Sequence, residues 1–93
     1  MSRVLVSTAK FRRAYHRLQE TDQNLVNHTL ERLSEYLETG RAAVGLGMKK
    51  LGPEIFEVRV GLSLRIVYVE EGAEVFLALL GNHDEVRRFL RRQ

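Results

Sequence analysis

The chain has 93 residues, of which 44% are hydrophobic and 29% are charged, and it contains no cysteine. This length suits one hydrophobic core, so we expect a single domain over residues 1–93. The composition is that of a globular protein and argues against disorder. The absence of cysteine excludes disulfides and thiolate metal sites. No apolar run approaches the roughly 20 residues of a membrane helix, and the first residues lead into a strand-like stretch rather than a secretory leader. We therefore expect a cytoplasmic protein without a membrane partner.

The formal net charge is +3, yet the arginines are unevenly placed. They gather in two clusters, one in the first helical segment and one at the C-terminus: Arg12, Arg13 and Arg17, then Arg87, Arg88, Arg91 and Arg92. A basic surface of this kind suits an RNA backbone or an acidic partner protein. Solubility alone is the commonest reason for such patches, so the clusters do not decide between these classes.

Two helices are expected in the first half of the chain. Ser7 is a suitable N-cap for the first, which we predict over residues 8–20. The second is expected to begin after Thr21 or Asp22 and to end at Gly40, a good helix terminator. Each has one apolar stripe at three- and four-residue spacing, formed by Phe11, Ala14, Tyr15 and Leu18 in the first and by Val26, Leu30, Leu33 and Leu37 in the second. These segments predict a helical hairpin.

The following segment, residues 40–54, is predicted to be an ordered loop, because it holds four glycines and the only proline of the chain. Its apolar side chains are expected to anchor it to the core: Val44, Leu46, Met48 and Leu51. The hydrophobic period then changes to two, which is typical of strands with one face on a core. Three strands connected by short turns are predicted, at residues 55–60, 64–69 and 75–80. The last is apolar on both sides, which places it inside the sheet.

A short C-terminal helix is predicted from Asn82, because Asn82 and Glu85 have the spacing of a capping box. Its inward residues are expected to be Val86, Phe89 and Leu90. The predicted fold is therefore α+β. It has an antiparallel sheet, made of a short N-terminal strand and the three-strand meander, with the two N-terminal helices packed on one face and the short helix at the C-terminus.

Four short segments of the second half follow one another in the order of a known family: residues 48–51 (MKKL), 56–61 (FEVRVG), 65–68 (RIVY) and 81–86 (GNHDEV). In this order the chain resembles the RelE/ParE superfamily of bacterial and archaeal toxins. The resemblance implies a toxin of a toxin–antitoxin pair, usually a ribonuclease that cuts messenger RNA on the ribosome. Its alternatives are a ParE-like toxin that binds DNA gyrase without catalysis, and a non-toxic module of the same fold that only binds a partner.

Three candidate catalytic residues lie on the first predicted hairpin. If Phe56 and its alternate neighbours face the helices, then Glu57, Arg59 and Arg65 share the opposite face. Two guanidiniums there could clamp a phosphate and stabilise the charge that develops during phosphodiester cleavage. The alternative is an exposed cross-strand ion pair with Glu57, which applies to Arg59 more than to Arg65. Arg65 matches the arginine of the family's strand motif.

His83 is the fourth candidate catalytic residue, as a general base or acid at the end of a strand; the alternative is a residue that only serves the helix start. The resemblance also implies RNA contacts by Arg87 and Phe89, although core packing is the role that we favour for Phe89. Lys49 and Lys50 could contact phosphates from the loop, or could simply be solvated. The chain differs from ribosome-dependent members, which carry lysines on the strand of Glu57 and a tyrosine near the C-terminus. We expect no cofactor and no metal, and an antitoxin as partner.

Overall fold

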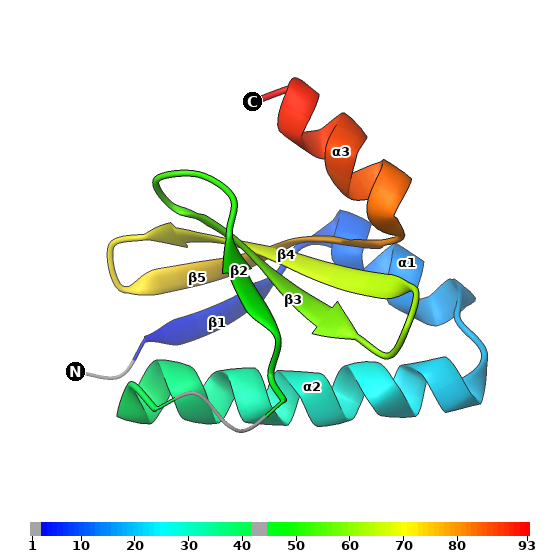
Figure 1. Cartoon of the computed structure of the whole chain (residues 1–93). Helices are drawn as coiled ribbons and strands as arrows, with labels where there is room; N and C mark the ends of the chain where they lie inside the picture. The colour runs from blue at the N-terminus through cyan, green and yellow to red at the C-terminus, as the bar shows by residue number, and fades with distance from the viewer. Residues whose placement is uncertain (1–2, 42–44) are drawn as a thin grey trace.

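The computed structural model describes residues 3–41 and 45–93. Within these ranges the chain forms one five-stranded sheet and three helices (Figure 1). In chain order the elements are β1 (Val4–Ser7), α1 (Ala9–Arg17), α2 (Glu20–Thr39), β2 (Met48–Lys50), β3 (Ile55–Val60), β4 (Leu64–Glu71), β5 (Glu74–Gly81) and α3 (His83–Arg91). Among the described residues, none of the helices has the length and apolar character needed to cross a bilayer.

The sheet has the strand order β1-β5-β4-β3-β2, and its central part is the predicted antiparallel meander. Strand β5 is paired on both sides, as predicted for a strand that is apolar throughout. The prediction of a wholly antiparallel sheet is wrong, because β1 pairs with β5 in parallel. The long connection through two helices allows this direction, and no local turn signal in the sequence records it.

The predicted loop between α2 and β3 contains a strand that sequence reasoning missed. Strand β2 pairs antiparallel with β3, with Lys49 opposite Glu57. Three residues are too few to show a period, and the flanking glycines indicate a loop. The predicted anchor Leu46 is buried, and Met48 and Leu51 are half-buried against the core. The fourth anchor, Val44, lies outside the described residues.

The helix ends differ from the predictions by a few residues. Thr8, not Ser7, caps α1, because its hydroxyl accepts the Phe11 backbone N–H at 3.2 Å. Helix α1 ends at Arg17, and α2 begins with Gln19 as its N-cap, ahead of the predicted Thr21 or Asp22. The end of α2 is as predicted: Gly40 has φ 77°, a left-handed conformation that favours glycine.

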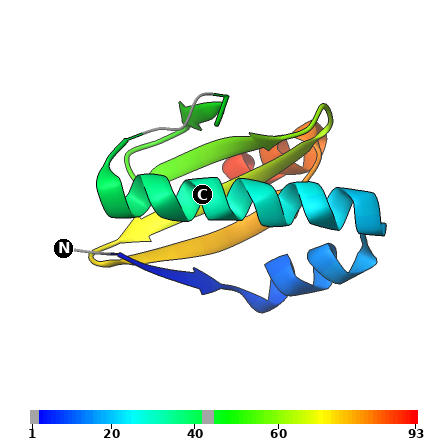
Figure 2. The same cartoon turned by 90° about the horizontal axis from the view of Figure 1, so that it is seen from below.

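The two faces of the sheet carry two separate apolar cores. Helices α1 and α2 cover one face, as predicted, and α3 lies on the other (Figures 1 and 2). The larger core joins Phe11, Val26 and Leu33 of the helices to Val58 and Ile66 of the sheet. The smaller core lies under α3 and consists of Val67, Leu79 and Val86, with Leu51, Ile55, Phe89 and Leu90 packed against it. Because this second core is small, part of the sheet face beside α3 is left for charged side chains.

Candidate functional site

A hollow of about 450 Å³ lies between α3 and strands β2, β3 and β4, on the sheet face that α1 and α2 do not cover. We call this surface the open face. Cationic, acidic and apolar side chains line the hollow together: Lys49, Leu51, Glu57, Arg59, Arg65, His83, Val86, Arg87 and Leu90. The list includes all four predicted catalytic residues and two of the predicted RNA contacts. The open-face hollow is therefore the candidate site.

The strand register brings the two arginines together. Arg59 of β3 and Arg65 of β4 are direct cross-strand partners, and Gly81 of β5 stands opposite Arg65 on its other side. Like charges at directly opposed positions are unfavourable without a counter-ion. Arg59 is exposed, and among the described residues no ion pair or side-chain hydrogen bond engages its guanidinium. The register thus places the Arg59 guanidinium, which has no such partner among the described residues, beside the Arg65 guanidinium.

The second arginine forms an ion pair on the open face. Arg65 Nε lies 3.6 Å from Glu57 Oε1, and only 16% and 14% of the two side chains are exposed. The ion pair with Glu57, expected for Arg59 more than for Arg65, is formed by Arg65 and is largely buried. Arg65 Nη1 also donates to the Leu64 carbonyl at 3.4 Å. These contacts hold the Arg65 guanidinium in place beside Arg59.

Gly47 and the strand β2 that follows it support Arg59 and Glu57 on β3. The Arg59 N–H donates to the Gly47 carbonyl at 3.2 Å. Gly47 has φ 62°, and a Cβ there would lie 3.4 Å from the Arg59 Cβ. The short strand β2 also places Lys49 beside Glu57, on the same face of the sheet. A segment that looks like a loop in the sequence thus supports two residues of the site.

His83 is exposed as the first residue of α3, and a capping box fixes the turn that presents it. The Asn82 side chain accepts the Glu85 N–H at 2.9 Å, and the Glu85 carboxylate accepts the Asn82 N–H at 3.0 Å. A Cβ on Gly81 would lie 2.8 Å from the Glu85 carboxylate. The predicted box is confirmed, and Gly81 leaves the space that it needs.

Two of the predicted RNA contacts lie outside the open-face hollow. Lys50 extends over the Phe56 ring, with Nζ 5.9 Å from the ring centroid. Phe89 is half-buried against the smaller core, the role that we favoured for it. Three residues that were not predicted for the site give the hollow apolar walls: Leu51, Val86 and Leu90. Their inward or anchoring character was visible in the sequence, but their position in the site depends on how α3 lies on the sheet.

Neither a family model nor a curated protein matches the chain by sequence. Solved structures match it over nearly its whole length. A chain of the Escherichia coli DinJ–YafQ toxin–antitoxin complex has a TM-score of 0.75 at 12% identity, covering 92% of this chain and 98% of that one. A copper-bound mutant toxin from Helicobacter pylori has 0.70 at 19%, covering 92% and 99%. A mutant of E. coli RelE has 0.69 at 20%, covering 99% and 98%. At these identities the likeness is one of fold.

Proposed function

We propose that this chain, which has the RelE/ParE toxin fold, is the toxin of a toxin–antitoxin pair and cleaves messenger RNA in the open-face hollow. The observation that carries the proposal is the direct opposition of Arg59 and Arg65 in a hollow that also contains Glu57 and His83. A phosphodiester at this pair would give Arg59 the counter-ion that it lacks among the described residues, beside the Glu57 carboxylate that pairs with Arg65.

The chemistry follows from the four side chains and needs no cofactor. The 2′-oxygen of a ribose attacks the adjacent phosphorus, and the bond from phosphorus to the 5′-oxygen breaks. Glu57 takes the proton of the 2′-hydroxyl, and His83 donates a proton to the leaving 5′-oxygen. Arg59 and Arg65 stabilise the added negative charge on the phosphoryl oxygens. The products are a 2′,3′-cyclic phosphate and a free 5′-hydroxyl.

The topology supports this division of roles. Glu57 lies two residues before Arg59 on β3, whereas His83 follows β5 two residues after Gly81, the partner of Arg65. Base and acid thus approach the arginine pair from opposite directions along the strands. An in-line displacement needs its base and its acid on opposite sides of the phosphorus.

Cleavage of a defined RNA is the direct test. We expect the purified protein, alone or with ribosomes, to give fragments with 2′,3′-cyclic phosphate ends. Induced expression should stop growth and produce codon-phased cuts in messenger RNA. The double variant Arg65→Ala/His83→Ala should abolish both effects. The control variant Arg41→Ala, which removes an exposed charge at the end of α2, should keep them.

Two other outcomes would indicate other functions. Growth arrest with intact RNA would indicate a gyrase-binding toxin, and no effect on growth would indicate a partner-binding module.

The proposed partner in the resting cell is an antitoxin. One of the similar structures is a toxin–antitoxin complex. An acidic or amphipathic antitoxin segment over the open-face hollow would neutralise Arg59, Arg65 and Arg87 and keep RNA out. Messenger RNA and the ribosome are the proposed partners of the free toxin.

A further inference from the structure

A second hollow, of about 340 Å³, lies on the other flank of α3. Lys10 of α1 and Leu79 of β5 form one side, and α3 with the residues that follow it forms the other. The charged and aromatic residues from that side are Glu85, Arg88, Phe89 and Arg92. We call this hollow the α1–α3 cleft. The proposed cleavage chemistry uses none of its charged residues.

Helix α3 separates the two hollows and divides its side chains between them with helical periodicity. His83, Val86, Arg87 and Leu90 line the open-face hollow. Glu85, Arg88, Phe89 and Arg92 line the α1–α3 cleft. Each set has spacings of three, one and three residues, which is the pattern of one helical stripe. Both stripes carry arginine, so the helix presents positive charge on two flanks.

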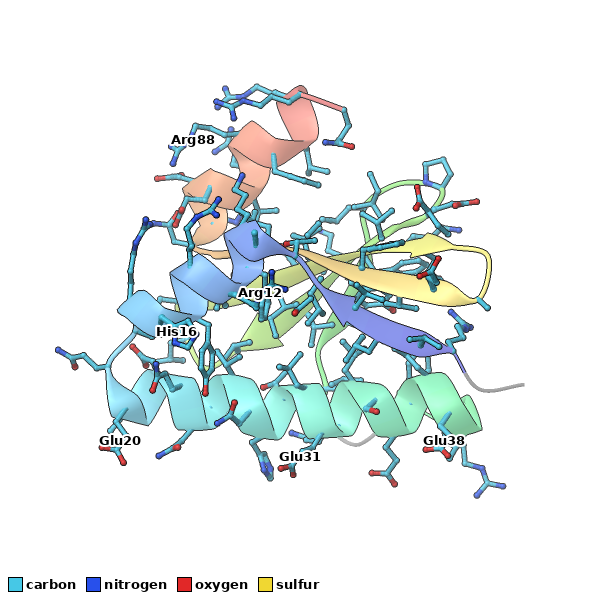
Figure 3. All side chains as sticks on the ribbon, turned by 180° about the vertical axis from the view of Figure 1, so that it is seen from behind. Arg12, His16, Glu20, Glu31, Glu38 and Arg88 are labelled. Carbon is cyan, nitrogen blue, oxygen red and sulfur yellow. The ribbon has the colours of Figure 1, made fainter. Side chains whose placement is uncertain are left out.

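Charged residues are also unevenly divided between the other two helices. Helix α2 carries five acidic residues and one arginine, whereas α1 carries four basic residues and no acidic one. Figure 3 shows Glu20, Glu31 and Glu38 pointing away from the sheet along α2, whereas Arg88 lies on α3, which packs on the other face of the sheet. A polyanion is therefore repelled along α2 and attracted to the α1–α3 cleft, where Lys10 of the basic helix α1 lies beside the arginines of α3.

We propose that the α1–α3 cleft binds a backbone phosphate of the same RNA strand whose scissile phosphate lies in the open-face hollow. The inference rests on the proposed function. Lys10, Arg88 and Arg92 supply three positive side chains against one acidic side chain, Glu85, whose carboxylate already accepts the Asn82 N–H. The RNA strand crosses α3 from one hollow to the other, so that a cluster of cations contacts a phosphate on each side of the helix.

RNA explains the arrangement better than an acidic peptide does. Both hollows carry excess positive charge, and only the width of a single helix separates them. A nucleic acid strand has a negative charge at every nucleotide and so satisfies both clusters at once. An acidic peptide needs acidic side chains at two matching positions to do the same. A polyglutamate peptide therefore serves as the competing ligand in the test below.

The test measures binding of a non-cleavable RNA, with 2′-O-methyl groups at every ribose, by fluorescence anisotropy at several salt concentrations. An oligonucleotide of about ten nucleotides should bind Arg88→Ala/Arg92→Ala about tenfold more weakly than the unaltered chain. The slope of log affinity against log salt should fall by about 0.7, which is the contribution of one phosphate contact on a single strand. A trinucleotide, which fills only the open-face hollow, should bind both proteins equally.

The matched control is Arg41→Ala/Arg91→Ala, which removes the same charge from exposed positions that line neither hollow. Circular dichroism checks that all variants are folded.

An equal loss of RNA affinity in the control and in the cleft variant would overturn the proposal, because it would show an effect of general electrostatics alone. Unchanged RNA affinity with lost binding of a polyglutamate peptide would also overturn it and indicate an acidic protein partner. If Arg59→Ala/Arg65→Ala weakens RNA binding while the cleft variant does not, the proposed function stands and this inference fails. If the unaltered chain binds no RNA, the proposed function fails.

Discussion

The two faces of the sheet are built from alternate residues of the same strands, yet their chemistry differs. On the face covered by α1 and α2, Val58, Val60 and Ile66 are at most 1% exposed. On the open face, Arg59 and Arg65 stand opposite each other beside a small apolar core. The covered face stabilises the fold by removing apolar surface from water. The open face holds two like charges at opposed positions, of which Arg65 is paired with Glu57 and Arg59 is left exposed to a ligand.

The sharpest test of this contrast places one substitution at two neighbouring positions of β3. Val58→Asp should abolish folding, because a buried carboxylate without a partner costs several kcal/mol out of the about 5–15 kcal/mol of a small domain. Arg59→Asp should leave the protein folded, since that side chain lies on the open face. Urea unfolding followed by circular dichroism measures both. A cooperative transition of normal midpoint in Val58→Asp would contradict the description of the covered face.

The division of side chains between the two faces of β3 and β4 could be predicted from the sequence. Because side chains on a strand alternate strictly, the pattern around Phe56 was enough to predict that Glu57, Arg59 and Arg65 share a face. The capping box also followed from residue types at fixed spacing. Local rules of this kind need no knowledge of what lies across the sheet.

The features that the sequence did not reveal depend on distant contacts. Strand β2 is too short to show a period, and it is a strand because β3 offers a free edge to pair with. The parallel direction of β1 depends on where two helices return the chain. The ion pair from Glu57 goes to Arg65 rather than Arg59 because of side-chain directions that register alone leaves open. The two stripes of α3 likewise become two hollows only when the helix lies on the sheet.

A second prediction concerns the pH dependence of the covered face. Burial, aided by the nearby Tyr36, raises the pKa of Tyr68 from 10.0 to about 12. The folded state therefore keeps a proton that the unfolded state releases, so stability is complete below pH 10 and is lost as the pH rises toward 12. Between pH 9 and pH 11 the free energy of unfolding should fall by about 1.4 kcal/mol from this group.

Tyr68→Phe is the control for this effect, because it keeps the ring that stacks on Phe56 and removes the hydroxyl that donates to Met48 Sδ at 3.5 Å. The variant should lose less stability than the unaltered chain over the same pH range in urea titrations. An identical loss in the two proteins would mean that other groups cause it. Activity at neutral pH should not change, since Tyr68 faces away from the open-face hollow.

The smallest expected effect belongs to the open face and concerns Gly81. Gly81→Ala would place a methyl group 2.8 Å from the Glu85 carboxylate, so that side chain must move and release the Asn82 N–H. We expect a loss of about 1 kcal/mol in the free energy of unfolding, the usual contribution of a helix cap. The rate of RNA cleavage should fall by a larger factor than the loss of folded protein accounts for, because the same turn presents His83.

Glu85→Ala is the control for this effect. It already removes the carboxylate, so adding Gly81→Ala to that variant should lower the free energy of unfolding little further. Additive losses in this double-mutant cycle would show that Gly81 acts elsewhere, since two changes that break one contact cannot each cost its full energy.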